Sequence, residues 1–538
     1  MSLRPHLALA IALAPLAGFA DTYPRQPGVD ALHYAFRLTL TDDSDVIEAE
    51  ASVELRFLRD GVASVALDLV GARDGVGMSV TAVLWEDAPA TFDHKGDRIS
   101  VSLPGAIVAG ERRRLSVRYR GEPASGLRIG PNLHGERTFF SDNWPNRARH
   151  WLPTIDHPYD KATCELIVEA PSHYQVISNG VLVEETDLPS GARRTHWRQS
   201  VPIATWLFVL GVARFAVDHY DEVDGRPLQS WVYPQDRENG FRDFSHPTRQ
   251  ALEYFSESIG PYAYEKLANV QSASVGGGME SATAIFYGEE LVKAERAPRL
   301  RDVIIHEIAH QWWGNAVTEA DWNDVWLSEG FATYFTLLFR EHAYGRDDFA
   351  RGLEEARGRV LDFNEKDPGY RVVHENLDDM AKVTTSQTYQ KGAWVLHMLR
   401  GIVGDDAFWR GVRAYYGEFS SKNATTADFR RVMEESSGRD LARFFRQWLE
   451  RGGIPRIEGG WRSSGKALEI DLRQTQDGEP FELEIPVVVE LEDGPPRVER
   501  VRMADRETKA SIPIESAPRS VALDPGLWVL MESAFVAR

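Results

Sequence analysis

The sequence predicts a multidomain α+β protein with β-rich regions at both ends. Its 538 residues exceed the roughly 250–300 residues at which one hydrophobic core stops growing. Alternating apolar and polar residues, typical of half-buried strands, occur in both terminal regions, and helical spacing dominates between them. We expect an N-terminal β domain at 21–220, a mainly helical domain at 221–455 and a small β-sandwich at 456–538. No large C-terminal helical domain is expected.

Residues 1–20 have the pattern of an export signal. Arg4 supplies a positive charge, residues 7–16 form an apolar stretch, and Gly18-Phe19-Ala20 is a small-x-small cleavage site. We expect cleavage between Ala20 and Asp21 and an exported chain, periplasmic or secreted. An uncleaved anchor is the alternative, although the apolar stretch is short for crossing a bilayer.

The composition excludes several classes of protein. The hydrophobic fraction of 43% and the charged fraction of 26% are those of a globular chain, not of a disordered or polytopic membrane protein. The net charge of -20 would repel phosphates, so no nucleic acid partner is expected. The single cysteine, Cys164, cannot form an intramolecular disulfide. We expect no stable membrane insertion, and the oligomeric state stays open.

Strands are predicted from period-two alternation near both ends of the chain. In the N-terminal region this pattern occurs at 34–40, 49–57, 115–119 and 206–212. Near the C-terminus it returns at 468–472 and 481–485, on either side of an Asp477-Gly478 turn. The short final strands predict a β-sandwich.

Helices are predicted where apolar residues recur three and four positions apart. One passes through Leu252, Phe255 and Ile259, and others are expected at 300–315, 327–343, 385–400, 405–416, 426–435 and 441–449. Thr426 is the expected N-cap of the helix at 426–435. The stretch 452–455, Gly-Gly-Ile-Pro, ends the last helix.

The middle region contains a metal-binding motif, HEIAH at 306–310. Residues four apart share a helical face, so His306 and His310 can reach one Zn²⁺. Glu307 is placed to reach a water on the metal instead. A catalytic zinc usually takes a third protein ligand, for which we favour Glu329. The alternative for Glu329 is a carboxylate that only interacts with the dipole at a helix start.

These motifs resemble the zinc aminopeptidases of the aminopeptidase N and leukotriene-hydrolase type, within the gluzincins. The resemblance rests on HEIAHQWWGN and WLSEGFATY, together with GGMES at 277–281 and YQKG at 389–392. It implies a saddle-like N-terminal β domain, a thermolysin-like catalytic domain, one Zn²⁺ per chain, and peptide substrates with a free N-terminus.

The resemblance also implies the chemistry of the site. His306, His310 and Glu329 would hold the zinc, and Glu307 would act as general base. Tyr389 would donate a hydrogen bond to the oxyanion that develops on the substrate.

The GGME segment would bind the substrate. Glu280 would pair with the free α-ammonium group, which explains cleavage at chain ends only. Gly277, Gly278 and Met279 would align the peptide as an added strand. This segment argues against a thermolysin-type endopeptidase, the first alternative. The second, a catalytically silent peptide-binding scaffold, should have lost ligands that are all present here.

Three positions depart from the family's pattern. Ser281 replaces an Asn. Thr336 stands where a Glu commonly orients a zinc histidine, so Asp324 or a backbone carbonyl is expected to substitute. Trp144 stands where a Gln or Glu helps to bind the amine, and Asp142 is the candidate substitute.

Overall fold

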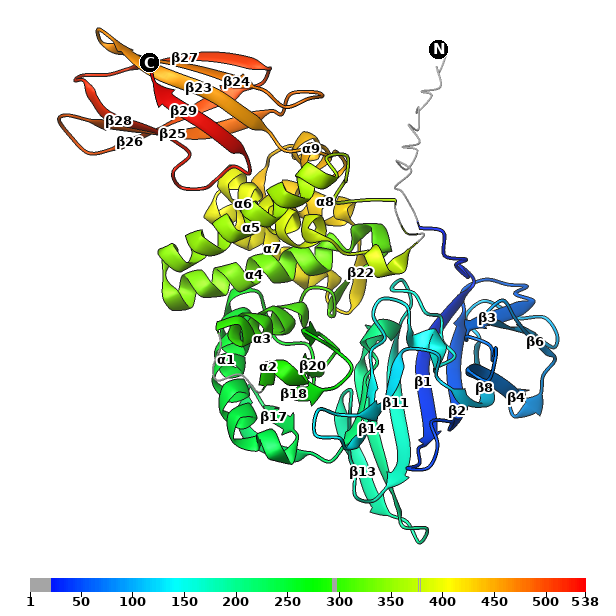
Figure 1. Ribbon diagram of the computed structural model, residues 1–538. Coiled ribbons are helices and arrows are strands. Elements are labelled where there is room, and N and C mark those ends of the chain that lie inside the picture. The colour runs from blue at the N-terminus through cyan, green and yellow to red at the C-terminus, as the bar shows by residue number, and fades with distance from the viewer. Residues whose placement is uncertain (1–20, 293–297, 376, 378) are drawn as a thin grey trace, which may run out of the picture.

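The computed structural model describes residues 21–292, 298–375, 377 and 379–538, so the predicted export signal lies outside the described residues. The large N-terminal sheet has the strand order β13-β14-β11-β1-β2-β8-β4-β5 (Figure 1). Its strands are β1 (Val29–Thr39), β2 (Ile47–Phe57), β4 (Gly77–Trp85), β5 (Ala88–Pro89), β8 (Arg112–Glu122), β11 (Lys161–Pro171), β13 (Val181–Asp187) and β14 (Ala192–Ala204). The β-rich character predicted for this region is confirmed.

Two smaller sheets complete the N-terminal region, with strand orders β3-β7-β6 and β12-β15-β10-β9. Their strands are β3 (Ser64–Asp68), β6 (Phe92–Lys95), β7 (Arg98–Ser102), β9 (Leu127–Pro131), β10 (Arg137–Ser141), β12 (Gln175–Ser178) and β15 (Leu210–Ala213). Short 3-10 helices lie at η1 (Ala148–His150) and η2 (Thr205–Leu207).

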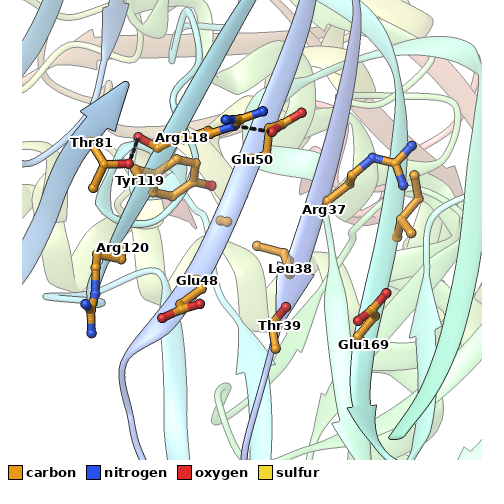
Figure 2. Close-up of a pocket in the computed structure, with 12 residues that line it drawn as sticks. Arg37, Leu38, Thr39, Glu48, Glu50, Thr81, Arg118, Tyr119, Arg120 and Glu169 are labelled. Carbon is orange, nitrogen blue, oxygen red and sulfur yellow. Dashed lines mark hydrogen bonds and ion pairs between the residues drawn. The ribbon is translucent and has the colours of Figure 1, made fainter. Parts of the chain in front are cut away.

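The exposed face of the large sheet carries a ladder of opposite charges (Figure 2). Arg118 on β8, Glu50 on β2 and Arg37 on β1 are cross-strand neighbours in one row. The Nε of Arg118 donates to Glu50 over 2.7 Å. Opposite charges facing each other across strands stabilise a sheet modestly. We interpret this shallow pocket as a solvated sheet face.

The middle unit begins with a five-stranded sheet of order β16-β17-β18-β20-β19. It contains β16 (Ala216–Val223), β17 (Arg226–Val232), β18 (Leu267–Ser272), β19 (Gly278–Met279) and β20 (Ala284–Gly288). No strand among the described residues pairs with the outer side of β19, so this edge is free to accept a peptide strand. β16 belongs to this sheet and crosses the boundary that was predicted at 220. The bounds of the domains stay predictions.

Helices form the rest of the middle unit (Figure 1). They are α1 (Arg237–Ser258), α2 (Glu289–Val292), α3 (Pro298–His310), α4 (Trp326–Tyr344), α5 (Arg346–Lys366), α6 (Gly392–Val403), α7 (Asp405–Phe419), α8 (Thr426–Ser437) and α9 (Ala442–Leu449). Short 3-10 segments are η3 (Pro234–Asp236), η4 (Trp322–Asp324) and η5 (Met380–Lys382), and β21 (Val317–Glu319) pairs with β22 (Lys422–Ala424). No helix in the described parts of the chain is long and apolar enough to span a membrane.

Two helical expectations are corrected, and one helix was not predicted. Thr425, not Thr426, caps α8, because its side chain accepts from the backbone of Asp428, whose carboxylate bonds the Thr425 nitrogen in return. The start of the helix expected at 385–400 is a π-helical turn, η6 (Gln387–Lys391), before α6. The sequence analysis missed α5, whose buried stripe includes the weakly apolar Gly352 and Ala356.

The C-terminal residues form two facing sheets, β27-β24-β23-β29 and β26-β25-β28. The strands are β23 (Arg456–Ser464), β24 (Ala467–Gln474), β25 (Leu483–Leu491), β26 (Arg497–Met503), β27 (Glu507–Pro513), β28 (Pro518–Leu523) and β29 (Glu532–Ala537). Trp448 of α9 packs against Phe481, with ring centroids 5.1 Å apart, and joins this sandwich to the helices.

Candidate active site

Three side chains that could hold a metal ion converge from two helices. His306 and His310 lie on α3, and Glu329 lies in the first turn of α4. The Nε2 atoms of the histidines are 3.0 Å apart, and Glu329 Oε2 lies 3.5 Å from His306 Nε2 and 3.2 Å from His310 Nε2. Ligands bound to tetrahedral zinc at about 2.0–2.1 Å would be about 3.3–3.4 Å apart. The three atoms therefore have the spacing of a zinc site.

The bonding of Glu329 supports the same interpretation. Its Oε1 accepts a hydrogen bond from the Tyr389 hydroxyl over 2.6 Å. Its Oε2, which faces both imidazoles, is buried and has no hydrogen-bond partner. A buried carboxylate oxygen without a partner is unfavourable unless a cation or proton satisfies it.

The charges around His310 also call for a cation. Burial lowers the pKa of His310, but the carboxylates of Glu280 and Glu329 raise it to about 10. Burial would raise the pKa of Glu329, but His310 and His306 lower it to about 2. A positive charge at the His310 Nε2 position is therefore strongly favoured, and a divalent cation supplies it without a proton.

The second nitrogen of His310 is oriented by the backbone. Its Nδ1 lies 3.0 Å from the Trp313 carbonyl oxygen and 3.1 Å from Ser328 Oγ. A proton on Nδ1 that is donated to this carbonyl leaves the Nε2 lone pair for a metal. Gly314 permits the approach, since a Cβ there would lie 2.2 Å from Ser328 Oγ.

Glu307 lies against the edge strand β19. A Cβ built on Gly278 would fall 2.2 Å from Glu307 Oε1, so only glycine leaves this carboxylate in place. Burial, followed by the nearby Glu280 carboxylate, raises the pKa of Glu307 well above its ordinary value. Ligand atoms of Glu280, Glu307 and His310 lie within 4.8 Å of one another, so the two carboxylates share one site.

Glu280 is held by its main chain and leaves its side chain free. Its carbonyl oxygen accepts from Gln311 Nε2 at 2.9 Å and from Asn315 Nδ2 at 2.7 Å. Its carboxylate Oε1 is buried without a hydrogen-bond partner, and burial raises the pKa of Glu280 to about 7. This carboxylate is therefore available for a cationic group from a ligand.

Tyr389 reaches the site because two helices meet at glycines. A Cβ on Gly330 of α4 would lie 2.9 Å from the Cα of Gly392 at the start of α6. This close approach places the preceding π-helical turn, which carries Tyr389, beside Glu329. Burial, and then the Glu329 carboxylate, raises the pKa of Tyr389 well above its ordinary value, so the hydroxyl stays a donor.

A cavity of about 680 Å³ opens beside Glu307 and Tyr389. Its walls include Gly278, Thr336 and, further out, Arg359 of α5. Glu307 lines this cavity, whereas Glu280 is not among the residues that line it.

Comparisons with known proteins agree with this geometry. Residues 245–448 match the peptidase family M1 domain, and residues 30–207 match the peptidase M1 N-terminal domain. The chain belongs to peptidase family M1. It is similar to an M1 zinc metallopeptidase from Deinococcus radiodurans, with a TM-score of 0.68 and 25% identity over 80% of this chain and 95% of that one.

Curated M1 relatives include glutamyl aminopeptidase of Homo sapiens, 28% identical over 64% of this chain and 37% of that protein. Probable aminopeptidase 1 of Saccharolobus solfataricus is 25% identical over 71% of this chain and 50% of its own length. The chain thus spans half or less of the length of these relatives.

The departures from the M1 pattern can now be placed. Thr336 Oγ1 donates to the Ala332 carbonyl within its own helix, and no described residue hydrogen-bonds His306 Nδ1. Asp324 does not reach the histidines: it accepts from Thr426 Oγ1 over 2.6 Å and from the Thr426 nitrogen. The Trp313 carbonyl orients His310 instead.

Asp142, the candidate substitute for binding the amine, is paired within the chain. Arg147 Nη2 donates to its carboxylate over 2.5 Å. Trp144 packs between Trp206 and Trp322, with ring centroids 4.8 and 5.0 Å away. Burial raises the pKa of Asp142, although Arg147 opposes this. Ser281 is buried beside Glu280.

The sequence analysis did not identify the residues that hold the main chain of Glu280, nor the residue that holds the loop at Asn315 and Ala316. Gln311 and Asn315 occur in HEIAHQWWGN, so the motif itself contained the signal. Lys161 of β11 donates from Nζ to the carbonyl oxygens of Asn315 and Ala316, each over 2.9 Å, and so joins the N-terminal sheet to this loop. Glu319 is 1% exposed, and neither carboxylate oxygen has a hydrogen-bond partner.

Proposed function

We propose that this chain is a zinc-dependent aminopeptidase that removes N-terminal residues from peptides. The observation that carries the proposal is the buried, unpaired carboxylate of Glu280 beside the three-ligand site. An α-ammonium group is the cation that every peptide with a free N-terminus offers. Its pairing with Glu280 would place the first peptide bond beside Glu307 and fix the register of cleavage.

The chain's own residues account for the remaining chemistry. A zinc ion held by His306, His310 and Glu329 would supply Lewis acidity. Glu307 takes a proton from the attacking water and passes it to the leaving amine as the C–N bond breaks. Tyr389, whose hydroxyl stays protonated, has one proton to donate. As the carbonyl oxygen gains negative charge, Tyr389 would turn this donor from Glu329 Oε1 to that oxygen.

The surroundings suit an extended peptide. The unpaired edge of β19 can align the substrate as an added strand, with Met279 at its buried end. The cavity that Glu307 and Tyr389 line would give room to the leaving part of the peptide. We also propose that the chain is exported and cut between Ala20 and Asp21, on the pattern of residues 1–20.

Paired substrates test the proposal. The purified chain should hydrolyse aminoacyl fluorogenic substrates with a free amine and act poorly on their N-acetylated counterparts. The Glu307→Gln variant, prepared in parallel, controls for a contaminating peptidase. Equal cleavage of free and acetylated peptides would make the chain an endopeptidase, and no cleavage of either would favour a binding scaffold.

Metal analysis tests the ligands. Elemental analysis should find about one zinc per chain, the usual stoichiometry of such a site. A chelator should abolish hydrolysis and added zinc should restore it. The double variant His306→Ala, His310→Ala should contain no zinc; full occupancy there would refute the ligand assignment.

A further inference from the structure

The turn that follows Glu280 has an unusual backbone conformation. Glu280 lies between β19 and β20, and the Ala284 nitrogen donates to the Ser281 carbonyl oxygen over 3.3 Å to close a turn. Thr283, at the third position of this turn, has a φ of +67°. Type II turns need a positive φ at this position and usually place glycine there, because a β-branched side chain is strained. Strained residues persist only where their surroundings hold them, and they cluster at ligand sites.

The hydroxyl of Thr283 is held by two donors. Thr283 is fully buried, and its Oγ1 accepts from the Gly180 nitrogen over 2.7 Å and from Lys266 Nζ over 3.1 Å. Gly180 lies between β12 and β13 of the N-terminal sheets. Lys266 Nζ also donates to the Ser178 carbonyl oxygen over 2.8 Å. The side chain that strains the turn is therefore the one that fastens it to the N-terminal sheets.

The main chain on either side is held as well. Asn179 Nδ2 donates to the Ala282 carbonyl oxygen over 2.7 Å. Gln311 bridges the turn, because its Oε1 accepts from the Thr283 nitrogen over 3.2 Å while its Nε2 donates to the Glu280 carbonyl oxygen over 2.9 Å. One side-chain amide thus ties Thr283 to Glu280, and a shift of the turn would move the Glu280 carboxylate.

Access to solvent excludes a catalytic role for the Thr283 hydroxyl itself. An amine 3.1 Å from a hydroxyl oxygen has the spacing of a base and its nucleophile. However, Lys266 is 1% exposed and Thr283 is 0% exposed, and neither lines the cavity beside Glu307. A substrate cannot reach an oxygen buried in this way, so the hydroxyl acts through the residues that it holds.

We propose that Thr283 is a positioning residue for Glu280. Its hydroxyl fastens the turn to Gly180 and Lys266, and so fixes the point at which the Glu280 carboxylate meets the α-ammonium group of a peptide. The inference deepens the proposed aminopeptidase function and rests on it. It also makes contact with the N-terminal sheets a requirement for the selection of free N-termini.

Three substitutions separate the hydroxyl from the strained backbone. Thr283→Gly removes the hydroxyl but suits a φ of +67°, so the chain should fold, and Thr283→Val keeps the shape without the oxygen. Both should lower kcat/KM for free-amine peptides roughly tenfold, since a buried hydrogen-bonding group is lost and Glu280 is misplaced. Thr283→Ser, which keeps the oxygen, should stay within about twofold of the parent. Unchanged kcat/KM in Thr283→Gly, or equal losses in Thr283→Ser and Thr283→Val, would overturn the proposal.

A double-mutant cycle shows whether Thr283 acts through Glu280. In a chain that already carries Glu280→Ala, Thr283→Gly should have little further effect on kcat/KM, because the group that it positions is gone. A loss of roughly tenfold that persists in this chain would assign Thr283 a general structural role and overturn the proposal. An absence of any effect of Glu280→Ala alone would instead refute the proposed function, and the inference with it.

Thr248→Val is the matched control. It removes another fully buried hydroxyl of the middle unit, which accepts from Asn269 Nδ2 over 2.8 Å. This variant should lose some thermal stability and keep kcat/KM within about twofold of the parent. A loss as large as that of Thr283→Val would show that any buried hydroxyl has this effect, and would overturn the assignment of Thr283.

Discussion

Two groups of charged side chains in this protein are organised in opposite ways. On the exposed face of the N-terminal sheet, Arg118 and Glu50 pair across strands and both remain in contact with water (Figure 2). At the catalytic centre, Glu280 and Glu329 are buried and each keeps an oxygen without a partner. The first group is complete within the chain, and the second is complete only with a ligand.

The charged side chains of the sheet face keep the surface solvated, whereas the buried carboxylates are placed to bind a ligand. Exposed ion pairs contribute about 0–1 kcal/mol and are screened by salt, so the sheet face can lose a charge without consequence. Buried carboxylates without partners destabilise the fold and persist where a metal or substrate satisfies them. Both pockets contain several charged side chains. They differ in whether those charges are paired within the chain, and this difference marks the active site.

The largest loss of activity is expected for a residue proposed to contact the substrate carbonyl. Tyr389→Phe should lower kcat by about 10²–10³, as loss of one oxyanion donor does. Because Tyr389 also hydrogen-bonds Glu329, zinc content is measured alongside kcat. An unchanged kcat at full zinc occupancy would remove Tyr389 from the mechanism.

Removal of the unpaired carboxylate should act on binding and register. Glu280→Ala should lower kcat/KM for free-amine substrates by an amount equivalent to about 2–5 kcal/mol, the range for breaking a desolvated charge pair. N-acetylated substrates, which have no cation to lose, serve as the matched control. Equal losses on both substrates would show that Glu280 supports the loop and does not bind the amine.

The cost of burying an unpaired carboxylate can be measured at Glu319 as a change in the free energy of unfolding with pH. Burial raises its pKa from 4.5 to about 8, so the folded chain keeps a proton that the unfolded chain releases. The folded state therefore binds more protons between these pH values, and stability falls as the pH rises through that window. Glu319→Gln, which cannot ionise, should gain stability over the parent by about 1.4 kcal/mol per pH unit in this range. Unfolding at pH 5 and pH 8 checks this; a constant difference would contradict the burial argument.

The smallest effect is expected on the sheet face. Glu50→Gln should change the free energy of unfolding by less than about 1 kcal/mol, and the change should shrink in high salt. Hydrolysis by this variant should match that of the parent. A large loss of activity would mean that the two charged groups are coupled and that the contrast drawn here is false.

The sequence predicted the site residues better than their surroundings. His306, Glu307 and His310 were identifiable because their spacing is local on one helix, and Glu329 was favoured from the spacing of a second motif. The structure groups His306 and His310 with Glu329, and Glu307 with His310 and Glu280, while their roles stay predictions. Asp324 could not be judged in this way, because its partner Thr426 lies 102 residues away in the chain. Neighbours of this kind depend on tertiary packing, which local patterns do not contain.

The same limit explains the missed supporting residues. Lys161 acts on the loop at Asn315 from a strand in another sheet, at a separation of 154 residues. Alternation correctly marked strands around it but carried no information about which loop they would contact. The helix α5 was missed for a local reason, since its glycine and alanine contacts are weakly apolar.

At the contact between Gly278 and Glu307, a substitution can leave the fold intact and still displace the side chain that the proposed reaction needs. A methyl group at position 278 would meet Oε1, Cδ and Cγ of Glu307 at 2.2, 2.3 and 2.4 Å. These atoms all belong to the Glu307 side chain and none to the backbone, so the side chain would have to turn away while the main chain could stay in place. A library of variants screened only for thermal stability would therefore keep substitutions at this position that we expect to abolish the proposed hydrolysis. Every substitution of Gly278 adds at least a Cβ atom that meets Glu307. Changes in substrate preference are therefore expected at other residues of the site.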